Sequence, residues 1–180
     1  MKNIKMKTLL LVVCAVFVTL SGCTDYTQGW PYPEDVDSVY VEMFNSKSLR
    51  RGAEYTLTDA ICKQLEVQTP YKIVSDRSRA DSIIYGEIVS LGDTVLSTEV
   101  ETGMPIEKET RLALVFSWKD LNTGKMYVNE KQVTASASYI REKKSSDLAT
   151  YNLSQSFEYA ADVAVNKAAE KVVESMRLEW

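Results

Sequence analysis

The N-terminal 23 residues constrain the fold of this chain most. Their pattern indicates that the most apolar segment is removed by cleavage and is not part of the folded domain. Lysines at positions 2, 5 and 7 precede an apolar run from Leu9 to Leu20, and the run ends in Leu20-Ser21-Gly22-Cys23. A basic start, a short apolar core and small residues before a cysteine are typical of a bacterial lipoprotein signal. The run is shorter than the roughly 20 residues that a membrane-spanning helix needs. We therefore interpret residues 1–22 as a lipoprotein signal peptide, against the alternative of a buried helix with a chance cysteine.

Cleavage before Cys23 predicts a mature chain that begins with a lipidated cysteine. One acyl chain holds a protein only weakly at a membrane, whereas several chains give a stable anchor. Thr24 follows the cysteine, so the aspartate that commonly retains lipoproteins in the inner membrane does not stand there. The sequence therefore predicts a protein held by lipid at the periplasmic side of the outer membrane.

Residues 23–36 are predicted to be the lipidated cysteine and a tether to the folded domain. Gly29, Pro31 and Pro33 lie there among polar and acidic residues, a composition typical of an extended linker. The alternative is that the aromatic side chains of Trp30 and Tyr32 pack onto the domain. The domain itself is expected over residues 37–180, and a mature chain of about 158 residues suits one hydrophobic core.

Composition argues against several classes of function. Loss of the three signal lysines leaves about 18 basic against 25 acidic residues, and an acidic chain suits nucleic acid poorly, because nucleic acid is bound through many phosphate contacts. Histidine is absent, which removes the usual general base and the commonest zinc ligand. Without Cys14 and Cys23, Cys62 stands alone, so we expect a buried structural thiol, with no disulfide, metal or cofactor. These features leave no Ser-His or Cys-His arrangement for nucleophilic catalysis.

The hydrophobic pattern predicts strands and two amphipathic helices. In the first strand, Val39, Val41 and Met43 should share one face, with Phe44 on the other, and 45–48 should form a loop. Strands are expected at 36–44, 71–74, 82–98, 110–118 and 125–138, and helices at 52–67 and 148–177. This order, β-α-β-β-β-β-α, predicts an α+β fold: a mainly antiparallel four- to five-stranded sheet with two helices packed on one face.

Both predicted helices carry an apolar stripe that can cover such a sheet. For the first helix, the stripe is Leu57, Ala60, Ile61 and Leu65. For the second, it is Phe157, Ala161, Ala164, Val165, Ala168, Val172 and Met176. A partner-binding face is the alternative for the second stripe, but the sheet needs a cover, which favours core packing.

Charged residues form several small groups whose roles the sequence leaves open. Glu99, Glu101, Glu107 and Glu109 surround a turn, and they suit either a solvated acidic loop or a weak cation site. Arginines at 50, 51, 77 and 79, and the run of Arg141, Lys143 and Lys144, suit either a solvated surface or contacts with phosphates or carboxylates. Whether any of these gather at one edge depends on the tertiary fold.

Several segments together resemble the LptE family of outer-membrane lipopolysaccharide-assembly lipoproteins. A strand ends in Phe44-Asn45, and a helix contains Leu57-Thr58-Asp59-Ala60. T-P-Y-K-I-V at 69–74, A-D-S-I-I-Y-G-E-I at 80–88 and the hairpin W-K-D-L-N-T-G-K at 118–125 follow. The resemblance covers about 37–178, and it rests mostly on residues that set the fold.

The resemblance implies a protein without a catalytic act. LptE-like proteins help to assemble and plug the β-barrel LptD, and they bind lipopolysaccharide through basic residues at one end of the sheet. For this chain, the resemblance makes Lys119 and Lys125, which flank the hairpin, the first candidates for lipopolysaccharide contacts, followed by Arg77 and Arg79. The expected partners are therefore an LptD-like barrel, lipopolysaccharide and the membrane that holds the lipid anchor.

A different reading of the same segments leads to a different function. They also resemble lipoproteins that activate peptidoglycan synthases, and the periplasmic domain of the curli-secretion lipoprotein. Activators usually carry a long disordered tether, whereas residues 24–36 are short and keep the domain near the membrane. Amphipathic barrel-forming segments of the secretion family are not evident. A periplasmic hydrolase is disfavoured by the missing histidine and by the lack of a nucleophile motif.

Overall fold

A computed structural model describes residues 32–48, 50–101, 103, 105–140 and 157–177. The predicted signal peptide, Cys23, Trp30 and the basic run Arg141, Lys143 and Lys144 lie outside the described residues. So does the first part of the second predicted helix, over 148–156. The elements are β1 (Ser38–Val41), β2 (Asn45–Ser46), α2 (Ala53–Gln68), β3 (Lys72–Ile73), a 3-10 turn (Arg77–Arg79), β4 (Ser82–Thr98), β5 (Pro105–Asp120), β6 (Met126–Ile140) and α3 (Phe157–Glu174).

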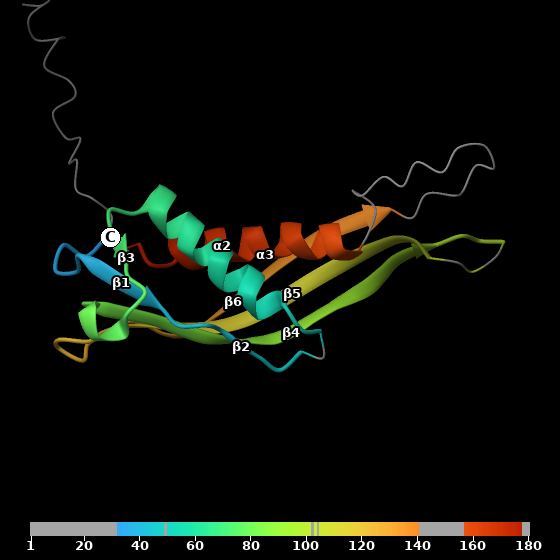
Figure 1. Cartoon of the computed structure of the whole chain (residues 1–180). Helices are drawn as coiled ribbons and strands as arrows, with labels where there is room; N and C mark the ends of the chain where they lie inside the picture. The colour runs from blue at the N-terminus through green and yellow to red at the C-terminus, as the bar shows by residue number, and fades with distance from the viewer. Residues whose placement is uncertain (1–31, 49, 102, 104, 141–156, 178–180) are drawn as a thin grey trace, which may run out of the picture. The chain divides into compact units, whose positions relative to one another are not determined.

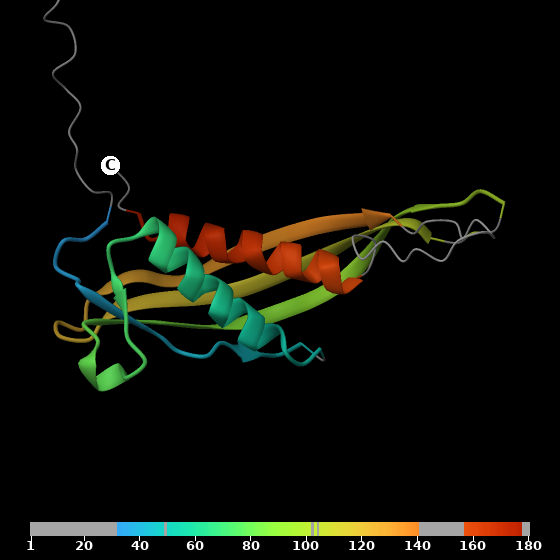
Figure 2. The same cartoon turned by 45° about the horizontal axis from the view of Figure 1, so that its top comes forward.

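The predicted α+β class is confirmed, and both helices lie on one face of the sheet (Figure 1; Figure 2). The described strands form one six-stranded sheet in the order β3-β1-β4-β5-β6. The sixth strand, β2, lies outside this order and pairs with β4. The long strands β4, β5 and β6 pair antiparallel, as predicted. The short strands differ, because β1 pairs parallel with β3 and β4, and β2 pairs parallel with β4. The crossover through α2 explains the parallel pairing of β1 and β3.

The prediction for the first strand is wrong in two respects. Residues 45–48 are not simply a loop, since Asn45 and Ser46 pair with Glu87 and Ile88 of β4. The alternation also breaks after Val41, because Met43 is half exposed while Phe44 is 1% exposed. The chain leaves regular strand geometry at Glu42 and resumes it at Asn45. This interruption turns the Phe44 ring into the core.

The two helical stripes are largely confirmed. Leu57, Ala60, Ile61 and Leu65 of α2 are all buried. In α3, Ala164, Val165, Ala168 and Val172 are buried as predicted, and so is Met176 just beyond the helix, whereas Phe157 and Ala161 are only half-buried. Ala160, Ala169 and Val173 are buried as well, because α3 packs against α2 in addition to β5 and β6. None of the helices in the described part of the chain is long and apolar enough to cross a membrane.

The long strands extend beyond the part of the sheet that the helices cover (Figure 1). β5 begins at Pro105 rather than near the predicted Thr110. Residues 105–109 were not predicted as strand, because buried apolar residues do not alternate with exposed ones there. Their backbones nevertheless continue the hydrogen-bonded ladder with β4. β6 is an edge strand of the sheet. Two α3 lysines cover this edge: Lys171 Nζ donates to the carbonyl of Thr134 at 2.7 Å, and Lys167 Nζ donates to that of Ser136 at 3.2 Å.

Candidate functional site

The turn between β5 and β6 is held by one carboxylate. Asp120 accepts hydrogen bonds from the backbone N–H groups of Asn122 at 2.7 Å and Thr123 at 2.9 Å. These bonds, that of Thr123 above all, lower the pKa of Asp120 below its ordinary 3.8. Gly124 closes the turn at φ 76°, a left-handed conformation that suits glycine. The hairpin end is therefore a defined platform.

A second carboxylate ties this hairpin to the start of β4. Asp81 accepts from Ser38 Oγ at 2.6 Å and from the Ser38 N–H at 2.9 Å, and its other oxygen accepts from the Asn122 amide at 3.3 Å. The Leu121 N–H donates to the Asp81 carbonyl at 2.7 Å. The bond from the Ser38 side chain is the largest reason that the pKa of Asp81 lies below its ordinary value. β1, β4 and the β5–β6 hairpin are thus joined at one end of the sheet.

Four aromatic side chains pack in a row behind this end. Ring centroids are 5.9 Å apart for Tyr32 and Tyr71, 5.9 Å for Tyr71 and Trp118, and 4.5 Å for Trp118 and Tyr127. Trp118 is fully buried, and its indole N–H donates to Ser82 Oγ at 3.0 Å. Tyr32 is 2% exposed, so this part of the predicted tether packs onto the domain, as the alternative reading allowed.

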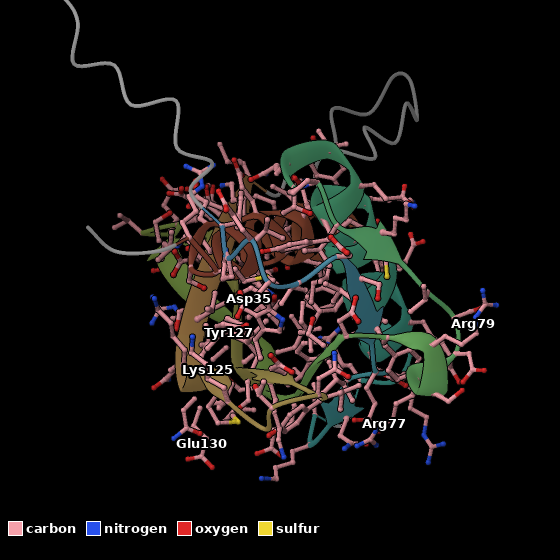
Figure 3. The ribbon with its side chains drawn as sticks, turned by 90° about the vertical axis from the view of Figure 1, so that its left-hand side faces the viewer. Asp35, Arg77, Arg79, Lys125, Tyr127 and Glu130 are labelled. Atoms are coloured by element: carbon pink, nitrogen blue, oxygen red, sulfur yellow. The ribbon has the colours of Figure 1, made fainter. Side chains whose placement is uncertain are left out.

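Tyr127 connects the aromatic row to the charged surface. Its hydroxyl donates to Asp35 at 2.7 Å and lies 3.4 Å from an oxygen of Asp120. Burial, together with these carboxylates, raises the pKa of Tyr127 well above 10, so the phenol stays protonated at neutral pH. Lys125 Nζ stands 4.7 Å from the centroid of the Tyr127 ring, within reach of a cation–π contact. Figure 3 shows Asp35, Tyr127 and Lys125 together on one side of this end.

A concave site of about 430 Å³ opens beside Tyr127, between β6 and the end of α3. We call it the hairpin-end hollow. Its apolar lining comes from Pro33, Trp118, Tyr127, Val128 and Met176. Its polar lining comes from Asn129, Lys131, Ser175 and Arg177. Arg177 Nε donates to the Tyr32 hydroxyl at 3.4 Å, and this bond is the main reason for the raised pKa of the guanidinium.

The structure places the four predicted lipopolysaccharide-binding residues at the same end of the sheet but not in one cluster. Lys119 is half-buried in β5 and is the cross-strand partner of Ile83 in β4. Successive side chains of a strand point to opposite faces, so Lys119 lies on the face opposite that of the buried Trp118, away from the helices. Lys125 lies at the turn beside Tyr127. Arg77 and Arg79 are exposed in the 3-10 turn, apart from Lys125 (Figure 3).

Two cations of the hollow, Lys131 and Arg177, are not among the residues predicted from the sequence. Lys131 follows a register shift and positive-φ Glu130 in β6, which strand alternation does not reveal. Arg177 is separated from β6 by more than 30 residues, so no spacing connects the two. The signal available in the sequence was aromatic. Trp118 and Tyr127 flank the β5–β6 turn, and Tyr71 precedes the 3-10 turn.

Two other charged residues singled out by sequence, Arg50 and Glu109, have structural partners. Arg50 stacks its guanidinium 3.4 Å above the centroid of Phe157. Glu109 pairs with Arg111 at 2.8 Å, and its pKa is lowered, chiefly by a hydrogen bond with Ser136. Among the described residues, no group of three or more acidic or cysteine side chains could hold a metal ion. Cys62 is half-buried, and burial is the main reason that the pKa of its thiol is raised.

This fold and site define a class: a two-layer α+β domain with basic and aromatic side chains gathered at one end of its sheet. The family model described as "LptE: Lipopolysaccharide-assembly" matches residues 36–177, and the chain belongs to this family. The predicted family resemblance is thereby confirmed. No curated protein matches the chain.

Solved structures share the fold at low sequence identity. Protein XCC0632 from Xanthomonas campestris matches with a TM-score of 0.54 and 9% identity, over 81% of this chain and 86% of that one. The PelC dodecamer from Paraburkholderia phytofirmans matches with 0.51 and 12%, over 83% and 96%. Uncharacterized lipoprotein B from Nitrosomonas europaea matches with 0.50 and 15%, over 80% and 90%. Such identities establish a common fold alone.

Proposed function

We propose that the protein is a non-catalytic lipoprotein of the outer membrane that binds an LptD-like β-barrel. It supports assembly of that barrel, plugs its lumen and assists delivery of lipopolysaccharide to the outer leaflet. The family match over residues 36–177 carries this proposal. Cys23, lipidated after cleavage of residues 1–22, would anchor the protein at the periplasmic side of the membrane.

The architecture supports a plug. Among the described residues, α2 and α3 cover one face of the sheet, and no helix covers the other (Figure 2). That open face carries half-buried and exposed polar side chains, among them Glu87, Ser90 and Lys119, beside the exposed Tyr85. The interior of a wide membrane barrel is polar, so a compact domain with a mixed polar face suits its lumen.

Contacts with lipopolysaccharide require cations, because its phosphates are bound best by charge-assisted hydrogen bonds. We propose Lys125 and Lys119 as the first such contacts, with Arg77 and Arg79 next. Lys125 is exposed at the tip of the hairpin, so it is more accessible than the half-buried Lys119. Its replacement by glutamate should weaken lipopolysaccharide binding more than Lys63→Glu, because Lys63 lies on α2 and pairs with Asp59.

The test is purification of the tagged full-length protein from detergent-solubilised outer membranes, with mass spectrometry of the proteins that accompany it. Recovery of one large LptD-like barrel in stoichiometric amount is the expected result. Recovery of a peptidoglycan synthase, or of no barrel, would contradict the proposal. A Cys23→Ala form expressed with the same tag serves as a control for the dependence on the lipid anchor.

A further inference from the structure

One long edge of the sheet has no partner strand among the residues that the structure describes. The pairing of β2 with β4 ends at Ile88, whereas β4 continues to Thr98 with β5 on its other side. Alternate residues of an antiparallel strand direct their N–H and C=O groups away from the partner strand. Residues 89–98, which we call the β4 edge, therefore present backbone donors and acceptors that no described strand satisfies.

The β4 edge also lacks the protection that folded proteins usually give to such edges, namely lysine, proline or a covering element. The opposite edge of the sheet, β6, has this protection, because Lys167 and Lys171 donate to its carbonyls. The β4 edge contains no lysine, arginine or proline. Its side chains include the exposed Val89, Val95 and Leu96. An extended apolar edge of this kind is suited to pairing with another strand.

The charges around the β4 edge are balanced within the subunit. Asp93 is the one charged residue of the edge. Its carboxylate accepts from the Tyr139 hydroxyl at 2.8 Å and lies 3.9 Å from Lys108 Nζ. On the neighbouring strand β5, Glu109 is paired with Arg111 at 2.8 Å. These pairs reduce the repulsion that an identical edge would meet on approach.

We propose that the β4 edge pairs antiparallel with the β4 edge of a second copy of this chain, with Gly92 at the two-fold axis. In this register, Ser90 faces Thr94 and Val89 faces Val95 of the other copy. Hydroxyl pairs and pairs of β-branched side chains are favourable across antiparallel strands. An axis at Asp93 would instead place two carboxylates directly opposite each other, which is unfavourable.

The two ends of the paired run fit each other under this axis. At one end, the position beside β4 is taken by β2, which pairs with Glu87 and Ile88. At the other end, the register of β4 against β5 shifts after Val95, and such an irregularity bends a strand. The axis brings the bend of one copy to the β2 of the other copy. Each strand therefore turns aside where β2 would block it.

Charges beyond these ends are complementary between the two copies. The β4–β5 tip carries Glu99 and Glu101, and the loop after β2 carries Arg50 and Arg51. The antiparallel pairing directs the tip of each copy toward this loop of the other, and opposite charges across an interface fix its register. A second copy also brings a strand that is already extended, whereas a flexible peptide would have to be ordered on binding. These observations favour a second copy as the occupant.

Disulfide cross-linking tests the axis in membranes of cells that express the full-length chain with Cys62→Ala. Residues that face each other in an antiparallel pair have Cα atoms about 4.5–5.5 Å apart, within the span of a disulfide. Gly92→Cys should therefore form a linked dimer under mild oxidation. Thr134→Cys, at an exposed position of β6, is the matched control and should stay monomeric. A Cβ atom at Gly92 meets no heavy atom within 4 Å, so these variants should fold, and unchanged thermal unfolding verifies this.

Sedimentation velocity of the full-length chain in excess detergent measures the strength of the pairing. One strand from each copy makes a small interface, so we expect a dimer with Kd on the order of 10 µM. Glutamate in Gly92→Glu lies opposite Arg111 in its own sheet but opposite a second glutamate across the axis. We expect at least about tenfold weaker self-association for this variant, because like charges there repel. Thr134→Glu, which adds the same charge on β6, should change Kd less than about twofold.

Several results would overturn this inference. They are a wild-type chain that stays monomeric to about 300 µM, equal effects of glutamate at positions 92 and 134, and a cross-link through Thr134→Cys but not through Gly92→Cys. Monomeric wild-type protein whose barrel recovery falls with Gly92→Glu would assign the β4 edge to the barrel instead of a second copy. The inference does not rest on the proposed function: a dimer from which no barrel is recovered would contradict that function and leave the paired edge intact.

Discussion

Gly86 is the position at which one added methyl group tests the packing of the sheet most directly. It lies in β4 opposite Phe116 of β5. A Cβ atom there would stand 2.7 Å from Cε1 of Phe44 and 2.9 Å from Cα of Phe116, and it would also meet the carbonyl oxygen of Val115. Phe44 is buried and the β5 backbone is held in its ladder on both sides, so neither can give way without cost. Gly86→Ala should therefore destabilise the fold.

We expect a loss of about 3 kcal/mol in the free energy of unfolding, at the upper end of the usual cost of overpacking a core. For a chain of this size, that loss lowers Tm by roughly 6–12 °C. Urea unfolding followed by far-UV circular dichroism gives the free energy from the midpoint and the slope. The slope should stay the same, because the substitution strains the native state and leaves the surface exposed on unfolding unchanged.

Gly92→Ala is the matched control in the same strand. A Cβ atom at Gly92 would have no heavy atom within 4 Å, and its φ is not in the left-handed region. Alanine there should be neutral or should stabilise by about 0.5–1 kcal/mol through a less flexible unfolded chain. Equal losses at the two glycines, or a loss below about 1 kcal/mol for Gly86→Ala, would refute the reasoning from close approach.

Three further predictions concern the edge, the hairpin end and the anchor. Replacing Lys167 and Lys171 with methionine should increase self-association in sedimentation velocity, because the edge carbonyls of β6 lose their donors and can pair with another strand; an unchanged monomer fraction would contradict this. Asp81→Asn should lower Tm at neutral pH and flatten its acid dependence. The folded pKa of Asp81 lies below 3.8, so the wild-type carboxylate stabilises above that value and loses its effect as pH falls through the lower folded pKa; parallel Tm curves from pH 6 to 2 would argue against it. Cys23→Ala should abolish labelling of the protein by radioactive palmitate in growing cells, whereas Cys62→Ala should leave it intact, and persistent labelling of Cys23→Ala would disprove the cleavage site.

Much of the fold was predictable because its long elements carry strong periodic patterns. The apolar stripe of α2 and the alternation of Leu112, Leu114, Phe116 and Trp118 each bury one face, and the sequence pattern located both. The pattern failed where burial no longer alternates. Phe44 turns inward after an interrupted strand, and residues 105–109 form strand by backbone pairing alone. The conformation of such segments is determined by the strands and side chains that they contact rather than by their own hydrophobic pattern.

The candidate site was less predictable than the fold. Lys125 was proposed because it flanks the Asp-Leu-Asn-Thr-Gly turn of a hairpin that resembles the family's. The structure places it beside Tyr127, and its contact with lipopolysaccharide stays a prediction. Arg177 and Lys131 were missed, since only the packing of α3 along β6 brings the end of the helix to the hairpin.

The sequence by itself determined the α+β class, the helical faces that cover the sheet and the family. These depend on local periodicity and on residues that act within one element. Tertiary structure alone decided the parallel pairing of β1 and β2 with β4, and the burial of Tyr32 in a segment that resembles a linker. It also decided which cations share an opening. The physical reason is that contacts between distant segments depend on how elements dock, and docking is set by the summed packing of many side chains rather than by any one motif.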